Sequence, residues 1–190
     1  MLKLLSISEK VSSWLARIGG LLLLACVGLI VTEVFLRKFF NYSIQGTDEL
    51  SGYALSISLA LSLPYALLKR AHIRVDALYN VFPYKFSAVL DWVSILSMNI
   101  FALFLLYSSY DVVHSSLRFE STSNTLLSTP LWIPQSVWFV GFIAFAITCF
   151  IILTLSTIYL AKGEFQNIKE LIGGKSVQEE LEEEISHAKN

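Results

Sequence analysis

The chain has 190 residues, of which 55% are hydrophobic and 15% are charged, and its mean hydropathy is +0.62. Soluble domains hold about 25% charged residues, so this composition excludes an ordinary water-soluble domain and favours a chain that lies mostly in lipid. The net charge is −1 and the 14 Lys and Arg are scattered along the chain, which excludes the basic surface of a nucleic-acid-binding protein.

Four long segments carry almost no charge and predict four transmembrane helices. A helix needs about 20 mainly apolar residues to cross a hydrocarbon core about 30 Å thick. The predicted spans are residues 18–36, 50–68, 86–110 and 136–161, which together form a membrane domain over 18–161. The sequence therefore predicts an all-α integral membrane protein in contact with membrane lipids.

Residues 1–17, which precede the first span, form a mildly amphipathic segment. Leu4, Ile7 and Val11 recur near helical spacing, and the cations of the segment lie toward the other side. This pattern favours a helix that lies at the membrane surface and runs into the first span. A frayed tail is the alternative.

Two acidic side chains lie near the ends of predicted spans. Glu33 precedes Arg37 by four residues, the favourable order for an ion pair on a helix. An acid within a span is also a functional candidate, so Glu33 is either half of an interfacial ion pair or a proton-carrying group. Asp91 lies in the second turn of the third span, with Lys85 close enough to pair with it.

The second span is rich in small and hydroxylic residues. Ala54, Ser58 and Ser62 recur every four residues, which places them in one stripe where another helix can approach closely. Thr47 or Asp48 is expected to cap the N-terminus of this helix.

A dense group of charged residues, 69–76, follows the second span. From Val75 onward, apolar residues recur at i, i+3, i+4 and i+7. This spacing predicts a short amphipathic helix over about 72–83, which is too charged to span the membrane and should lie in its interface. Near the other end of the chain, the tail 162–190 turns strongly acidic and is predicted to be a solvated helix or a disordered segment.

The distribution of Lys and Arg predicts the orientation, because cations accumulate on the cytoplasmic side of membrane proteins. With the N-terminus inside, the inner segments hold eleven of the 14 cations. The outer segments hold only Arg37, Lys38 and Arg118. Both termini are therefore expected in the cytoplasm, with residues 69–76 as the main anchor at the inner membrane face.

Catalytic and cofactor sites are not indicated by the sequence. His72, His114 and His187 lie outside the middle of the spans, so a transmembrane haem has no pair of axial ligands. The chain has no Cys/His cluster at metal spacing and no phosphate-binding glycine loop. We expect no catalytic residue, cofactor or metal here, and an accessory subunit of a larger complex; a membrane enzyme subunit is a less favoured alternative.

Three consecutive motifs carry a family resemblance: Arg37-Lys38-Phe39-Phe40-Asn41, then residues 43–50 (SIQGTDEL), then residues 69–76 (KRAHIRVD). This order resembles the small permease (DctQ-type) subunit of tripartite ATP-independent periplasmic (TRAP) transporters. The similarity covers about residues 12–161, and Ala71 departs from it where a glycine is more usual. The positions that match the motifs are candidates for a subunit interface, or for topology control and helix capping: Arg37, Asn41, Asp48, Glu49, His72, Arg74 and Asp76.

The resemblance implies a separate, non-catalytic subunit of the bacterial cytoplasmic (inner) membrane. Such a subunit braces a large (M-type) permease subunit, which holds the substrate and sodium sites, while a periplasmic binding protein delivers an organic acid. Which acid is transported is not readable from this chain. A different class of function is also considered: a small four-span proton-coupled exporter with Glu33 as the proton carrier.

Overall fold

The computed structural model describes residues 2–70 and 83–173. In these residues the helices are α1 (Leu2–Phe40), α2 (Thr47–Leu68), α4 (Tyr84–Arg118), α5 (Trp132–Lys162) and α6 (Phe165–Ile172). Within the described part, four helices are long and apolar enough to cross a membrane. The predicted all-α membrane fold is confirmed.

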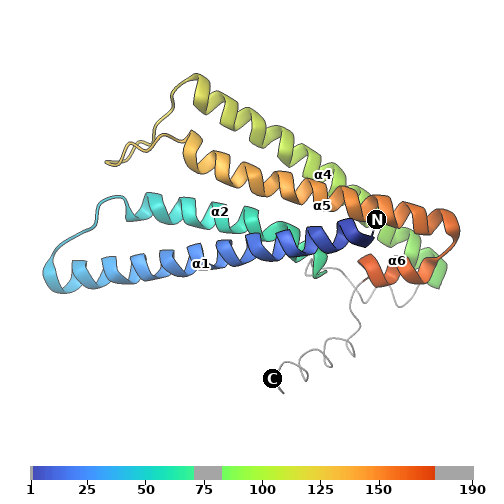
Figure 1. Cartoon of the computed structure of the whole chain (residues 1–190). Helices are drawn as coiled ribbons and strands as arrows, with labels where there is room; N and C mark the ends of the chain where they lie inside the picture. Colours follow the sequence, from blue (N-terminus) through green and yellow to red (C-terminus); the bar gives the residue numbers. More distant parts are fainter. Residues whose placement is uncertain (1, 71–82, 174–190) are drawn as a thin grey trace, which may run out of the picture.

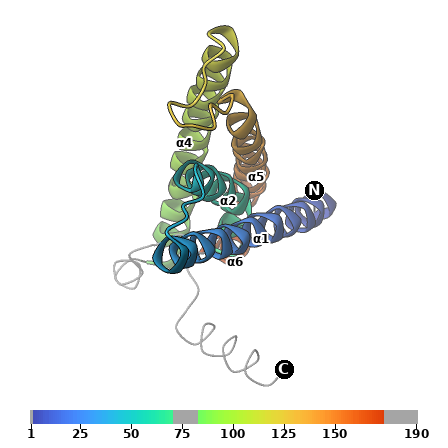
Figure 2. The same ribbon diagram turned by 90° about the vertical axis from the view of Figure 1, so that its left-hand side faces the viewer.

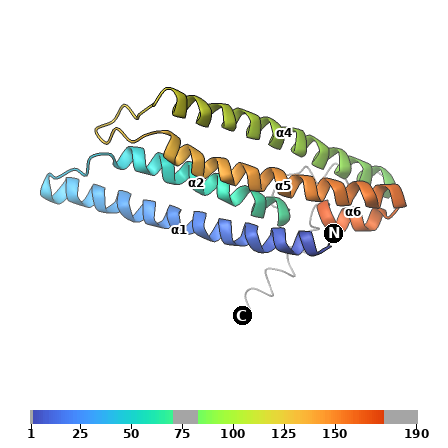
Figure 3. The same cartoon turned by 45° about the horizontal axis from the view of Figure 1, so that its top comes forward.

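The long helices lie side by side in a row in the order α1, α2, α5, α4 (Figure 3). Seen from one end, α2 lies between α1 and the α4–α5 pair (Figure 2). The short helix α6 packs against α4 and α5 (Figure 1). One end of the row carries the α1–α2 and α4–α5 connections, and we call it the loop end. The opposite end, where α1 begins and α6 lies, is the terminal end (Figure 1).

The first helix is longer than the span predicted for it. α1 contains 39 residues, which at 1.5 Å per residue makes it about 58 Å long, well beyond a hydrocarbon core of about 30 Å. The amphipathic segment continues into the first span as one helix from Leu2, so the frayed-tail alternative is wrong for these residues. No proline interrupts this stretch of the chain, and the backbone hydrogen bonding can therefore run unbroken.

Two close crossings hold α2 between its neighbours. A Cβ added at Gly19 of α1 would lie 3.0 Å from the backbone oxygen of Ser58, and the Ser58 Oγ donates to the Gly19 carbonyl oxygen at 2.8 Å. On the other side, a Cβ added at Gly141 of α5 would lie 2.7 Å from the Ala60 carbonyl carbon. Small residues thus let three helices approach to backbone contact.

The buried apolar core lies between α4, α5 and α6. Ile95, Phe145 and Cys149 form its centre together with Ile168 of α6. The beginning of the tail, residues 165–172, is a helix, which is one of the two predicted alternatives, but this helix is packed against the core and not fully solvated, since its Ile168 is 0% exposed. Its apolar positions recur at helical spacing among charged residues, so it covers the core with one face.

Two predicted segments cannot be compared with the structure. Of the interfacial helix over 72–83, residues 72–82 lie outside the described residues, as does the acidic part of the tail. The candidate residues His72, Arg74 and Asp76 fall in the first of these segments.

Candidate functional site

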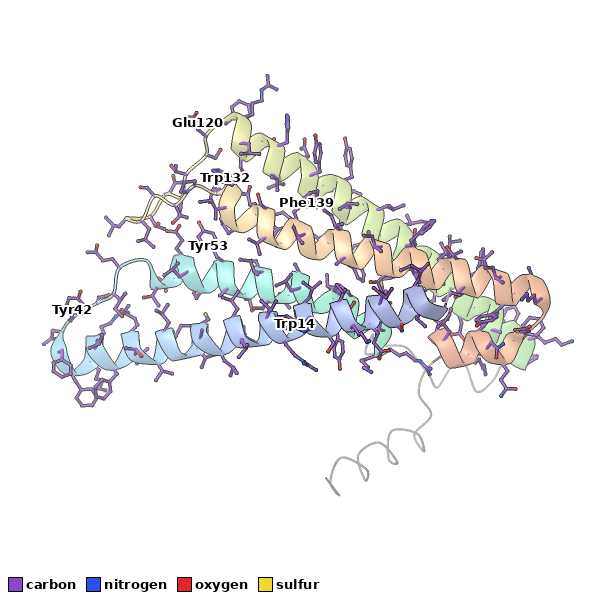
Figure 4. The ribbon with its side chains drawn as sticks, viewed as in Figure 1. Trp14, Tyr42, Tyr53, Glu120, Trp132 and Phe139 are labelled. Carbon is purple, nitrogen blue, oxygen red and sulfur yellow. The ribbon has the colours of Figure 1, made fainter. Side chains whose placement is uncertain are left out.

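The polar residues of the loop end form two hydrogen-bonded clusters, each built around a buried carboxylate. They involve the α1–α2 connection, residues 41–46, and the α4–α5 connection, residues 119–131. Figure 4 shows Tyr42, Glu120 and Trp132 at this end of the molecule. The carboxylates come from α1 and α2.

Glu33 anchors the α1–α2 connection to α1. Its Oε1 accepts hydrogen bonds from Arg37 Nε at 3.0 Å, Arg37 Nη2 at 2.6 Å and Ser43 Oγ at 2.7 Å. Its Oε2 accepts from the backbone N–H of Ile44 at 2.5 Å. Glu33 is only 3% exposed, and a buried charge needs such partners because it has lost its water. The predicted Glu33–Arg37 ion pair is confirmed, at 2.6 Å.

Glu49 joins the start of α2 to the α4–α5 connection. Its Oε1 accepts from the Tyr53 hydroxyl at 2.8 Å, and its Oε2 accepts from the Thr125 hydroxyl in the α4–α5 connection. Next to this contact, Leu127 occupies the space that a Cβ would need at Gly46. The α4–α5 connection therefore rests directly on the start of α2.

The start of α2 differs from the predicted cap. Gly46, with φ 85° and ψ 4°, precedes the helix, which begins at Thr47. The Thr47 hydroxyl donates to the Ile44 carbonyl oxygen at 2.9 Å, so it closes the preceding turn instead of capping the helix. Glycine suits this position because it adopts a positive φ without steric cost.

The remaining predicted site residues within the described part of the chain are either buried between α2 and α1 or exposed at the loop end. Ala54 and Ser58 are buried, and the stripe they form with Ser62 faces α1 of the same chain, since the Gly19 crossing lies against Ser58 and Ser62. The other candidates at the loop end are exposed, and they are Arg37, Asn41 and Asp48.

Asp91 lies away from the loop end. It is 1% exposed on α4, one turn after Ser87 and Ala88, which are also buried. Ala88 and Ile168 belong to the same core cluster, so this part of α4 is the part that α6 covers.

Both carboxylates at the loop end accept hydrogen bonds from groups of their own chain. Among the described residues, no group of three or more His, Cys, Asp and Glu side chains could hold a metal ion. The two carboxylates hold the loops in place: Glu33 binds the α1–α2 connection to α1, and Glu49 binds the α4–α5 connection to α2.

Sequence reasoning identified Glu33, Arg37 and Glu49 but not most of their partners. Tyr53 lies four residues after Glu49 and could have been found from this helical spacing. Thr125 is 76 residues from Glu49, and no local pattern marks it.

Comparison with known proteins identifies the family. Residues 26–158 match the family described as "Tripartite ATP-independent periplasmic transporters, DctQ component". The chain belongs to the DctQ family. It is thus a small membrane subunit of a TRAP transporter, a tripartite system with other subunits. No curated protein and no solved structure matches the chain.

The matched region of this DctQ protein includes both carboxylate clusters and all of α2 and α4. It leaves out the first 25 residues and α6; α1 begins, and α6 lies, at the terminal end of the molecule (Figure 1).

Proposed function

We propose that this DctQ protein is a non-catalytic brace for the large permease subunit of its transporter. One observation carries the proposal: the outer helices of the row, α1 and α4, present long apolar faces outward, while the buried acids of the loop end hold the chain's own connections. Such faces must be covered by lipid or by another protein. Two opposite faces allow one to meet the partner and the other to meet the bilayer.

The exposure of individual side chains supports this division. On α1, Leu21 and Leu24 are 67% and 69% exposed, and on α4 Phe104 and Tyr107 are 63% and 73% exposed. These residues lie well inside the long helices, and no helix in the described part of the chain covers them. The two outer helices of the row, α1 and α4, are thus apolar on their outward faces.

The proposal also covers transport and location. The large (M-type) subunit would hold the sodium and substrate sites, and a periplasmic binding protein would deliver an organic acid to it. The chain would lie in the bacterial inner membrane with both termini in the cytoplasm. The excess of Lys and Arg in the segments assigned to the inside supports this orientation.

The test is reconstitution with and without this chain. The protein is expected to copurify with a large membrane subunit, and sodium-driven uptake in proteoliposomes is expected only when both subunits and the binding protein are present. Uptake that persists without this chain, or uptake by this chain alone, would contradict the proposal.

The exporter alternative finds less support in the geometry of Glu33. A proton carrier has to exchange protons with water on both sides of the membrane. Both oxygens of Glu33 accept hydrogen bonds from its own chain, and the side chain is almost fully buried. The brace hypothesis accounts for this arrangement directly.

A further inference from the structure

The terminal end of the molecule carries a groove between the first turns of α1 and the last turns of α2. Its volume is about 470 Å³, and the residues that line it include Glu9, Lys10, Trp14, Arg17, Tyr65 and Lys69. We call it the basic groove. It lies nearer the beginning of α1 than the carboxylate clusters do, with Trp14 marking its place on α1 (Figure 4).

Cations outnumber anions in the basic groove by three to one among these residues. Lys69 Nζ pairs with Glu9 Oε1 at 3.1 Å, and both side chains are about half exposed, at 47% and 53%. Lys10 and Arg17 are exposed and add their positive charges on the same side of α1, because residues 10 and 17 are two turns apart. The groove therefore favours an anion.

The length of α1 places this groove at the membrane boundary. Arg17 and Arg37 are 20 residues apart on one continuous helix, which corresponds to about 30 Å, the thickness of the hydrocarbon core. With Arg37 at one boundary, Arg17 lies at the other and Lys10 lies two turns further out. Arg17 and Lys10 are then at the height of the lipid headgroups.

The aromatic residues of the groove agree with this depth. Trp14 is 67% exposed, and Trp and Tyr are enriched where the acyl chains meet the headgroups. The Lys69 ammonium lies 5.7 Å from the centre of the Tyr65 ring, so Tyr65 also helps to position the cation that faces the groove.

We propose that the basic groove binds the headgroup phosphate of an anionic phospholipid. The Arg17 guanidinium can donate two parallel hydrogen bonds to phosphate oxygens, and the Lys10 ammonium adds a second charge-assisted donor. The acyl chains would lie along the exposed apolar surface of α1. The proposal depends on the membrane location of the chain and not on its proposed role in transport.

The experiment uses the full-length protein purified in detergent and incubated with phosphatidylglycerol or phosphatidylcholine, with bound lipid counted by native mass spectrometry. The test variant is Lys10→Gln with Arg17→Gln. The matched control is Lys38→Gln with Arg118→Gln, which removes one exposed Lys and one exposed Arg at the loop end. Inorganic phosphate is the soluble probe.

Phosphatidylglycerol binding is expected to fall about 25-fold in the test variant, since each cation near a membrane surface contributes about a fivefold factor and the variant removes two. The control should retain the lipid, and phosphatidylcholine and inorganic phosphate should bind weakly to the unmodified protein. The thermal unfolding midpoint in lipid-free detergent should be the same in both variants.

Three results would overturn the proposal. The first is an equal loss of lipid in the two variants, which would make the attraction a property of overall charge, or no loss in either, which would mean that Lys10 and Arg17 do not bind the lipid. The second is binding of inorganic phosphate as strong as that of phosphatidylglycerol, which makes the groove a site for a soluble anion. The third is a test variant that keeps its lipid but loses a copurifying membrane subunit, which makes the groove a protein contact. None of these results depends on a transport assay.

Discussion

Glu33 and Glu49 have similar roles at two positions: each is a buried carboxylate near a helix end that accepts hydrogen bonds from its own helix and from a loop. For Glu33 the donors are Arg37, Ser43 and the Ile44 backbone. For Glu49 they are Tyr53 and Thr125. Hydrogen bonds to a charged acceptor are stronger than those between neutral groups, so these two side chains set the shape of the loop end.

Replacing Glu33 by Gln tests this role. The amide keeps the shape of the side chain, but it removes the negative charge and places an NH2 donor either against the Ile44 N–H or against the Arg37 and Ser43 donors. We expect the unfolding midpoint to fall by a few degrees and the Ile44 amide to exchange faster with deuterium. Glu9→Gln, at a half-exposed position, is the control and should change neither measurement. If Glu33→Gln instead left stability intact and abolished proton-coupled transport by the isolated chain, the exporter hypothesis would replace the brace.

At the scale of helices, the packing is determined by small residues and not by the apolar spans as such. Gly19 and Gly141 each lie against the backbone of α2. The Ala54/Ser58/Ser62 stripe is used inside the chain, against α1, so it is not available to the large subunit. Under the proposed brace role, the partner would contact other exposed apolar side chains, such as those on the outer faces of α1 and α4.

Gly141→Ala is expected to destabilise the protein by about 1–3 kcal/mol, the usual cost of overpacking. The added methyl would lie 2.7 Å from the Ala60 carbonyl carbon, which is backbone and cannot turn aside. Gly28→Ala is the matched control, because a Cβ there meets nothing within 4 Å and alanine favours the helix. Thermal unfolding in one detergent measures both. Equal stability of the two variants would mean that α2 and α5 are not in backbone contact.

Ile168→Ala tests whether α6 is part of the folded core. Ile168 is 0% exposed, and removing its outer carbons from a packed site costs about 2–4 kcal/mol. Ile147→Ala on α5 is the control, since Ile147 is 55% exposed and its loss should matter little. Unfolding midpoints should separate the two variants clearly. A small effect of Ile168→Ala would mean that α6 is not packed in the core and that the predicted solvated tail is correct.

At the scale of the whole molecule, the chain is an open row with its connections at one end and its α1 start and α6 at the other (Figure 1). The two outer helices of the row, α1 and α4, both expose apolar side chains. This shape suits a subunit that widens a larger membrane protein, because each side can contact a different surrounding.

The proposed orientation can be measured by labelling single cysteines in intact cells. Leu126→Cys lies in the α4–α5 connection, where Leu126 is 78% exposed, and Glu164→Cys lies just after α5 at an exposed position. We expect a membrane-impermeant maleimide to label the first from outside, and the second only after the inner membrane is opened. The native Cys26 and Cys149 are buried and should react little, which the unmodified protein checks. The reverse labelling pattern would contradict cytoplasmic termini.

The sequence by itself determined the membrane helices and the Glu33–Arg37 pair. Both depend on residues close together in the chain: hydropathy over about 20 residues is what the bilayer selects, and a four-residue spacing brings two side chains together on any helix. The small-residue stripe on α2 was visible for the same reason, although the sequence did not say which helix would cover it.

Only the tertiary structure decided the order of the row, the packing of α6 and the contact of Thr125 with Glu49. Each depends on residues far apart in the chain, and the apolar residues of a helix face do not specify which other helix will cover them. α6 has eight residues, too few for a spanning signal, and its charged neighbours gave the segment the appearance of a tail. Its apolar face is buried because α4 and α5 provide an apolar surface against which it packs.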